Sequence, residues 1–286
     1  MANTISKAVL ITGCSTGIGR STAERLARNG HTVYATARRL ESIADLAQHG
    51  CKLLALDVCD EASMQAAVAA VERQHGAVGV LINNAGYGSE GPAEEVPMSE
   101  VRRQFETNVF GLLRLSQLVL PNMRRQGWGK IVNLSSMGGR MTLPGGGIYH
   151  ATKYAIEALS DALRFEVRGF GVDVIVIEPG AIKTEFGPTA IARVDALGGS
   201  ADYAAFREVL KQQIRNAYEG PMAAFAAGPE AVAKVIEKAI TARRPRTRYL
   251  IALGAHILVR LRRVLPDRVF DAFLRTQFPT PRPTAP

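Results

Sequence analysis

The chain alternates between two patterns of apolar and polar positions. Short runs rich in β-branched and apolar residues predict seven strands, at residues 8–12, 32–36, 52–56, 78–83, 130–135, 172–177 and 249–252. The intervening segments carry apolar residues near the 3.6-residue period and predict helices at residues 20–29, 64–74, 99–125, 149–168 and 229–243. Because strands and helices alternate and the strands are almost continuously apolar, we expect a parallel sheet covered by helices on both faces.

Length and composition limit the number of domains and the compartment. With 286 residues, 47% of them apolar, and no Ser- or Gly-rich linker, the chain predicts one large α/β domain over residues 1–286. Cys14, Cys51 and Cys59 are odd in number and form no CxxC pair, which favours a reducing compartment and no structural metal site. The sequence shows neither a signal-peptide pattern nor an uninterrupted apolar run of about 18 residues, so we expect a cytoplasmic protein.

Positive charge is concentrated at one end of the chain. The formal net charge is +9, but ten arginines and two aspartates, a balance of +8, lie between Thr241 and the C-terminus. The preceding residues are therefore close to neutral. A basic face spread over the molecule would indicate nucleic acid, whereas this distribution predicts no nucleic-acid partner and directs attention to the tail.

A glycine-rich segment directly follows the first predicted strand. It reads TGCSTGIG, residues 12–19, and a predicted helix comes next. Gly13, Gly17 and Gly19 permit a tight turn, close approach of the backbone to a pyrophosphate and close packing of helix on strand. Strand, turn and helix form the context that dinucleotide binding requires, so we predict a Rossmann-type cofactor site that also includes Ser15, Thr16 and Ile18.

Tyr149 and Lys153 stand four positions apart in a predicted helix. Residues i and i+4 project from one helix face, so the two side chains lie close together. A lysine charge near the phenol favours phenolate and would lower the pKa of Tyr149 from about 10 toward the range of a proton-transfer catalyst. Taken alone, an ordinary pair on a helix surface explains the same spacing.

The glycine loop departs from the GxGxxG spacing, and here the chain resembles the short-chain dehydrogenase/reductase family, whose motif is TGxxxGxG. Further segments follow in the family's order over residues 5–250: LDV at 56–58, NNAG at 83–86, TNVFG at 107–111, IVNLSS at 131–136, YHATK at 149–153 and PGAIKT at 179–184. The resemblance implies hydride transfer between a nicotinamide and a carbonyl or alcohol carbon.

The resemblance also implies roles at the reacting centre. Tyr149 would be the general acid in reduction and the general base in oxidation, and Lys153 would hold the nicotinamide ribose and lower the pKa of Tyr149. Ser136, at the end of a predicted strand, would donate to the carbonyl oxygen; Ser135 is the alternative, with packing as its more ordinary role. Asn108 would hold a water that connects Lys153 to solvent, unless it only caps or kinks a helix.

Other residues of these motifs are expected to contact the cofactor. Asp57 matches the acidic residue near the adenine ring, although an ordinary turn at a strand end also explains it. The remaining matches lie in the NNAG and PGAIKT segments and are Asn83, Ala85, Gly86, Pro179, Gly180, Ile182 and Thr184.

The residues that end the second strand bear on the choice between NAD and NADP. An acidic residue there accepts from the ribose 2′-hydroxyl of NAD, whereas a cation binds the 2′-phosphate of NADP. Ala37 occupies the acidic position and Arg38 follows it. Because a guanidinium contacts phosphate bidentately, we predict NADP(H), with Arg38 as the first candidate and Arg39 as the second. Two solvated arginines at a helix start are the alternative.

Residues 184–227, called the substrate segment below, are predicted to fold over the substrate. The segment is rich in alanine and contains Phe186, Tyr203, Phe206, Tyr218, Met222 and Phe225. These side chains suit a bulky apolar ligand, although packing of helices on the core explains most of them equally well. The stretches NAGYGSEGPAEEV and RRPRTRYLIA resemble the steroid and retinoid branch of the family, including 17β-hydroxysteroid dehydrogenases.

Two other functions remain open. A regulator that binds NADP without catalysis would be expected to lack the tyrosine–lysine pair, which is intact here. A reductase of 3-oxoacyl thioesters would not be expected to carry so long a C-terminal extension. We also expect a homodimer or homotetramer, as the resemblance implies.

The C-terminal tail, residues 253–286, predicts a basic amphipathic helix after the last strand. Its apolar positions recur at helical spacing among arginines: Leu258, Leu261, Val264 and Leu265 among Arg260, Arg262 and Arg263. Three roles remain open for such a helix: a border of the substrate mouth, contact with an anionic membrane surface, or docking on the body or a second subunit.

Overall fold

The computed structural model describes residues 5–220, 223 and 225–281. Its centre is one sheet of seven parallel strands in the order β3-β2-β1-β4-β5-β6-β7. The strands are β1 (Val9–Ile11), β2 (Val33–Ala37), β3 (Lys52–Ala55), β4 (Val80–Asn83), β5 (Gly129–Leu134), β6 (Val172–Pro179) and β7 (Arg248–Ile251). The predicted doubly wound α/β sheet is confirmed.

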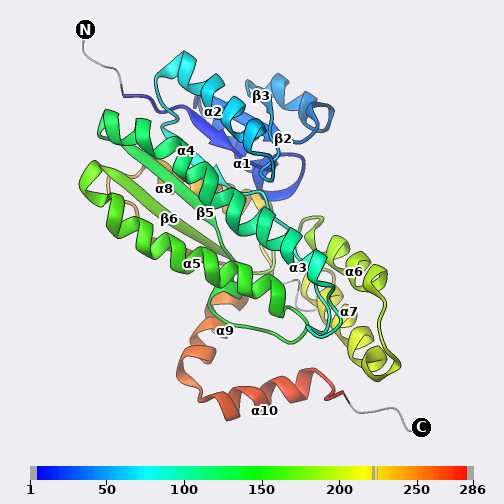
Figure 1. Cartoon of the computed structure of the whole chain (residues 1–286). Coiled ribbons are helices and arrows are strands. Elements are labelled where there is room, and N and C mark those ends of the chain that lie inside the picture. Colours follow the sequence, from blue (N-terminus) through cyan, green and yellow to red (C-terminus); the bar gives the residue numbers. More distant parts are fainter. Residues whose placement is uncertain (1–4, 221–222, 224, 282–286) are drawn as a thin grey trace.

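Helices cover both faces of the sheet (Figure 1). The main helices are α1 (Gly17–Arg28), α2 (Glu61–His75), α3 (Met98–Phe105), α4 (Gly111–Gln126), α5 (Gly147–Val167) and α8 (Pro229–Thr241). Alternate residues of a strand point to opposite faces, so Val9 and Ile11 pack with α1 and α8 while Leu10 packs with α2 and α4. Two buried apolar layers therefore fix the ends of the strands, where the loops lie.

The long helix predicted at residues 99–125 is interrupted. A π-helical turn, Glu106–Phe110, separates α3 from α4. Within it the amide of Asn108 is fully buried and binds the backbone of Tyr87 on both sides: Oδ1 accepts from the Tyr87 N–H at 3.0 Å and Nδ2 donates to the Tyr87 carbonyl at 2.8 Å. The wider turn accompanies this side chain, which pins the loop after β4 to the helix.

Among the described residues, 3-10 helices lie in the connections at Leu40–His49, Met137–Gly139, Arg168–Phe170 and Ala201–Tyr203. The segment Leu40–His49 was not predicted, although Ile43 and Leu46 bury their side chains against α1 and β2.

The substrate segment and the tail are helical. The substrate segment contains α6 (Phe186–Leu197) and α7 (Ala204–Tyr218), and the tail contains α9 (Leu253–Val264) and α10 (Asp267–Gln277) in place of the single predicted helix. Pro266 immediately precedes α10, where a proline ends the preceding helix and starts the next one. Figure 1 shows the two tail helices meeting at a sharp bend, with the end of α10 below α7. Among the described residues, no helix is long and apolar enough to cross a membrane.

Candidate active site

A cavity of about 760 Å³ opens at the carboxyl ends of the strands. Its walls come from the loops after β1, β2, β3, β4, β5 and β6, from the start of α5, and from α6 and α7. In this strand order, β2 and β4 lie on opposite sides of β1, so the chain reverses its direction across the sheet at β1. Open α/β sheets bind ligands at such a switch point.

The glycine loop forms one end of the cavity with its backbone. Gly13 has a φ of +71°, and a Cβ there would lie 2.9 Å from the Cα of Ala85. A Cβ on Gly19 would lie 2.3 Å from the carbonyl oxygen of Gly13, which leaves room only for hydrogen. Asn84 fixes this contact because its Nδ2 donates to the carbonyls of Thr12 and Gly13 at 2.8 and 3.0 Å.

The first turn of α1 lies on the cavity wall. Thr16 is the N-cap residue and its side chain accepts no capping hydrogen bond, so the first backbone N–H groups of α1 have no side-chain acceptor. Helix N-termini with free N–H groups favour phosphate. The glycine cradle and this helix start fit the pyrophosphate of a dinucleotide cofactor, and Gly13, Ser15, Thr16, Gly17 and Ile18 are the residues that would hold it.

Arg38 and Asp57 line the same cavity, from the loops after β2 and β3 on the glycine-loop side. Arg38 is exposed, and no described residue forms a hydrogen bond or ion pair with its guanidinium. Arg39, in contrast, is not part of the cavity wall and caps the following 3-10 helix with its backbone. Asp57 accepts from the N–H of Cys59 at 2.9 Å, so it stabilises the turn after β3 as well as lining the cavity.

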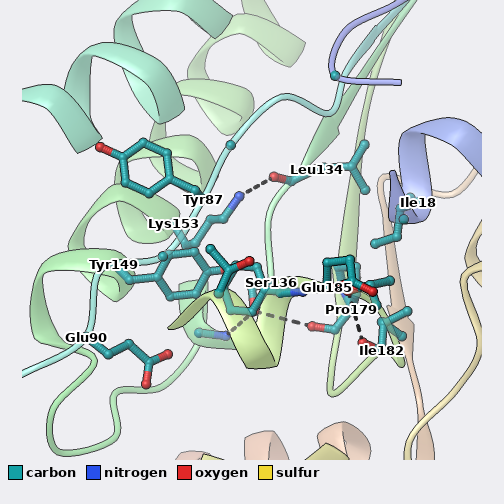
Figure 2. A pocket seen from close by; sticks show the side chains of 18 of the residues that line it. Ile18, Tyr87, Glu90, Leu134, Ser136, Tyr149, Lys153, Pro179, Ile182 and Glu185 are labelled. Atoms are coloured by element: carbon teal, nitrogen blue, oxygen red, sulfur yellow. Dashed lines mark hydrogen bonds between the residues drawn. The ribbon is translucent and has the colours of Figure 1, made fainter. Parts of the chain in front are cut away.

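Ser136, Tyr149 and Lys153 meet on one wall (Figure 2). The hydroxyl of Ser136 accepts from the N–H of Gly138 at 3.0 Å, donates to the carbonyl of Pro179 at 3.3 Å, and lies near enough to the phenol of Tyr149 to lower its pKa. Lys153 donates from Nζ to the carbonyl of Leu134 at 2.7 Å, and its Nζ lies 5.6 Å from the centre of the Tyr149 ring. The loop after β5 and the first turns of α5 therefore bring the predicted groups together.

The direction of the Tyr149 pKa differs from the sequence-based expectation. Burial raises the pKa of Tyr149, the hydrogen bond from Ser136 opposes that rise, and the charge of Glu90 adds to it. Burial also lowers the pKa of Lys153 to about 8, partly offset by the charge of Glu157. Desolvation dominates because both groups lie deep in the wall, so at neutral pH the phenol of Tyr149 carries its proton.

Three of the predicted site residues do not line the cavity and instead stabilise the structure around it: Asn83, Asn108 and Gly19. Asn83 lies inside the sheet and donates to Ser116 Oγ and Asn133 Oδ1, and it is absent from the cavity wall. Asn108 is also absent from the wall and is occupied by Tyr87 and Thr152. Gly19 serves only the close packing of α1.

Ser135 and Ser136 are adjacent but differ in surroundings. Ser135 is buried, and a Cβ on Gly139 would lie 2.7 Å from its Oγ, on the side of α5. Ser136 is half-buried and contacts Tyr149. This difference agrees with the preference for Ser136 over Ser135.

The other end of the cavity is largely apolar. Its wall includes Leu143, Phe186, Leu210, Ile214, Ala217, Tyr218 and Phe278. Phe278, beyond the end of α10, packs on Phe206 with ring centres 6.1 Å apart, so the tail supplies part of this wall. Tyr203 and Phe206 belong to the small core of the substrate segment, Phe225 is exposed, and Met222 lies outside the described residues.

Sequence reasoning missed several residues of this wall. Tyr87 and Glu90 belong to the loop after β4, within the NAGYGSEGPAEEV stretch, but were not singled out there, and Leu143 and Phe278 come from two further segments that match no motif. Asn84 belongs to the NNAG segment and could have been included from it. Among the described residues, no group of three or more His, Cys, Asp or Glu side chains is placed to hold a metal ion.

Comparison with known sequences identifies the family. The family described as short chain dehydrogenase matches residues 7–193, and the chain belongs to it. Uncharacterized oxidoreductase YbbO of Escherichia coli is 35% identical over 95% of each chain. An NADPH-dependent 3-dehydrocapnine reductase of Ornithobacterium rhinotracheale is 34% identical, over 92% of this chain and 94% of its own. A 3-ketodihydrosphingosine reductase of Bacteroides thetaiotaomicron is 41% identical, over 62% and 65%.

Solved structures agree on the fold. A short-chain dehydrogenase from Streptomyces avermitilis superimposes with a TM-score of 0.78 at 32% identity over 95% of each chain. A serine dehydrogenase complexed with NADP+ gives 0.73 at 26% identity over 86% of this chain and 94% of its own. A relative from Burkholderia phymatum in complex with NAD gives 0.76 at 26% over the full length of both. The family thus binds nicotinamide cofactors of both kinds, and this protein is an oxidoreductase of the short-chain type.

Proposed function

We propose that the protein transfers hydride between NADP(H) and a bulky apolar ketone or the corresponding secondary alcohol. The observation that carries the proposal is that Ser136, Tyr149 and Lys153 meet on one wall of a cavity that begins at a glycine-rich turn and a helix N-terminus. A bound nicotinamide would supply or accept the hydride. The side chains supply the proton and hold the oxygen at which charge develops.

Tyr149 is the proton donor in the direction of reduction. Its pKa is raised by burial, so the phenol is protonated at neutral pH and ready to donate to the carbonyl oxygen of the substrate. Ser136 donates to the same oxygen and orients it toward the phenol. Lys153 binds the ribose and holds its positive charge near the ring of Tyr149, which favours recovery of the proton afterwards.

Asn108 acts through position. Its amide binds Tyr87 and Thr152, so it connects the loop after β4 to the start of α5. A water chain from Lys153 to solvent would therefore run beside the Asn108 amide. The cofactor contacts at Asp57, Ala85, Gly86, Pro179, Gly180, Ile182 and Thr184 are proposed on their place in the cavity wall.

The preference for NADP(H) rests on Arg38. Its guanidinium lies on the cavity wall with no partner among the described residues, and Ala37 leaves no carboxylate to repel a phosphate. The name of the 3-dehydrocapnine reductase includes NADPH, which supports the same choice.

The substrate class rests on the apolar end of the cavity. Leucine, isoleucine and aromatic side chains line it, as expected for a poorly soluble ligand. Two relatives are named for reducing a 3-keto and a 3-dehydro compound, and none of those reported above is named for a steroid or retinoid. The steroid- or retinoid-like shape therefore stays one proposal within the wider class of bulky apolar ketones.

A substrate panel tests the function. NADPH and NADH oxidation should be followed with steroids, retinal, long aliphatic ketones and 3-oxoacyl thioesters, using Tyr149→Phe as the control for background turnover. We expect turnover with NADPH and one or more bulky ketones. Turnover restricted to 3-oxoacyl thioesters would replace this function with the alternative, and cofactor binding without any turnover would favour a regulator.

For the tail we propose a border of the cavity, with contact to an anionic membrane surface and docking on the body or a second subunit as the alternatives. Leu253, Ile257, Val264 and Val269 are exposed on α9 and α10 close to arginines, which suits adsorption to anionic lipid. Sedimentation with anionic and neutral vesicles at low and high salt tests this. Full-length protein that stays in solution with anionic vesicles at low salt would exclude the contact.

A cytoplasmic location and a homodimeric or homotetrameric state are proposed on the family alone. Sedimentation of the purified protein measures the assembly, and a monomer at micromolar concentration would contradict it.

A further inference from the structure

Glu90 brings a carboxylate into the apolar end of the cavity. It belongs to the loop between β4 and α3 and lies on the cavity wall, and Figure 2 shows it and Lys153 on opposite sides of the Tyr149 ring. Tyr149 and Tyr218 of α7 line the same cavity, and the charge of Glu90 adds to the rise that burial causes in the pKa of both phenols. Burial raises the pKa of Glu90 itself to about 7.

No described residue neutralises this carboxylate. Neither a hydrogen bond nor an ion pair connects Glu90 to the part of the chain that the structure describes. Three cations of the same wall are engaged elsewhere: Lys153 binds the Leu134 carbonyl, and Arg103 and Arg193 bind Glu100. The fourth, Arg38, follows β2 beside the glycine loop. Burial lowers the pKa of His150 to about 4, so its ring is neutral at physiological pH.

The backbone around Glu90 is held in place. Ser89 on one side donates to Glu100, and the N–H of Gly91 on the other side donates to the carbonyl of Gly145 at 2.7 Å. Gly88 packs so closely on Phe186 that a Cβ would lie 2.7 Å from its ring. These contacts fix where the side chain starts, so the carboxylate is a built feature of the cavity and not the end of a mobile loop.

An unpaired carboxylate in a largely apolar cavity is less stable as an anion than in water, and it takes up either a proton or a cationic ligand. A cationic ligand would approach from the cavity, because no described residue forms an ion pair with Glu90. An ammonium compensates for the charge best, since it brings the opposite charge and three donors, whereas an alcohol or amide leaves the charge in place.

We propose that Glu90 binds an ammonium group that the substrate carries next to its carbonyl, so that the substrate is an amino ketone with a bulky apolar chain. The group is adjacent to the carbonyl because Glu90 lies beside Tyr149, which donates to the carbonyl oxygen. The proposal rests on the proposed reduction of a bulky ketone and specifies which ketones are preferred.

Three ketones of equal chain length test the proposal kinetically: a long-chain α-amino ketone, its N-acetyl derivative and the ketone without nitrogen. For the wild type we expect a kcat/KM for the amino ketone at least about tenfold above that for the N-acetyl derivative, the scale of a charge-assisted contact. Glu90→Gln should remove this difference and leave the ketone without nitrogen within about twofold. Equal loss on all three would overturn the proposal.

Glu94→Gln is the matched control, because Glu94 belongs to the same loop, is exposed and lies outside the cavity wall. It should retain the preference for the amino ketone. Turnover of ketones without any such preference in the wild type would reject the role of Glu90 but keep the reductase, whereas no turnover with any ketone would reject the proposed function itself.

Equilibrium binding gives a second readout. A long-chain primary amine and the alcohol of equal length should be titrated into the protein in the presence of NADP+, with the dissociation constant measured by calorimetry. The wild type should bind the amine at least about tenfold more tightly than the alcohol, and Glu90→Gln should bind them about equally. An amine that binds both proteins with the same affinity would contradict the proposal.

Discussion

The two halves of the cavity are built by different means. The half near β1 is formed by backbone: a glycine at positive φ, an asparagine bound to two carbonyls and the first turn of α1. The half near α6 and α7 is formed by side chains from the substrate segment, the loop after β4 and the tail. Backbone can bind a group that every member of the family shares, whereas side chains can change without disturbing the sheet. We therefore call the half near β1 the cofactor half and the half near α6 and α7 the substrate half, since the first suits a shared cofactor and the second a particular substrate.

The largest expected effect, on turnover, is that of replacing Tyr149, which lies on the wall between the two halves. Tyr149→Phe removes the proton donor but keeps the ring that packs on Phe186, with ring centres 5.4 Å apart. Turnover should fall by about 10² to 10⁴-fold, while NADPH affinity changes little. Single-turnover kinetics and fluorescence titration with NADPH measure both, and turnover close to that of the wild type would refute the mechanism.

Lys153→Ala should affect both halves, because the same ammonium is proposed to bind the ribose and lies 5.6 Å from the centre of the Tyr149 ring. We expect about a tenfold to hundredfold loss of turnover together with a weaker affinity for NADPH. Lys183→Ala, which changes an exposed lysine of the neighbouring PGAIKT segment, is the control and should leave both nearly unchanged. If Lys153→Ala kept the NADPH affinity of the wild type, Lys153 would not bind the cofactor.

Arg38→Asp tests the cofactor half alone. Removing the partner of the 2′-phosphate and adding an acceptor for a 2′-hydroxyl should shift the ratio of kcat/KM from NADP(H) toward NAD(H) by about tenfold to a hundredfold. Arg39→Asp is the matched control because Arg39 is outside the cavity wall. If only Arg39→Asp changed the preference, the assignment of Arg38 would be wrong.

The smallest expected effect is that of Glu90→Gln on the stability of the protein without substrate. This effect should depend on pH. Because the folded pKa of Glu90, about 7, exceeds the unfolded value of 4.5, the folded state binds more protons between these pH values, and its stability falls as pH rises through them. The melting temperature of Glu90→Gln should exceed that of the wild type more at pH 8 than at pH 4.

His150 acts in the opposite direction, since its pKa is lowered to about 4 and stability rises with pH until the unfolded value of 6.5 is passed. It is present in both proteins, so the difference in melting temperature isolates Glu90. A difference that does not grow with pH would show that Glu90 is as well solvated in the folded as in the unfolded chain.

The same division explains what the sequence could predict. The strand segments, the glycine loop, Ser136, Tyr149 and Lys153 follow from local patterns, because each motif is contiguous and its geometry is set by the adjoining strand or helix. Asn83 was predicted to contact the cofactor but binds Ser116 and Asn133 inside the sheet, since neighbouring residues of a strand point to opposite faces.

The substrate half could not be predicted in this way. Glu90 lies in a stretch with several acids, and its pattern does not distinguish a cavity residue from the exposed Glu94. Phe206 and Phe186 are similar in sequence terms, yet one fills the core of the substrate segment and the other faces the cavity. These outcomes depend on how α6, α7 and the tail pack, which is tertiary information.

The position of Phe278 near the C-terminus means that one part of the cavity wall is synthesised last. A ribosome makes the glycine loop, the tyrosine and the lysine early, and the sheet cannot close before β7 is released. The ring of Phe278, which packs on Phe206 and closes part of the cavity, emerges after every strand. The cavity end near α7 is therefore the last to be completed, when the tail folds back onto Phe206.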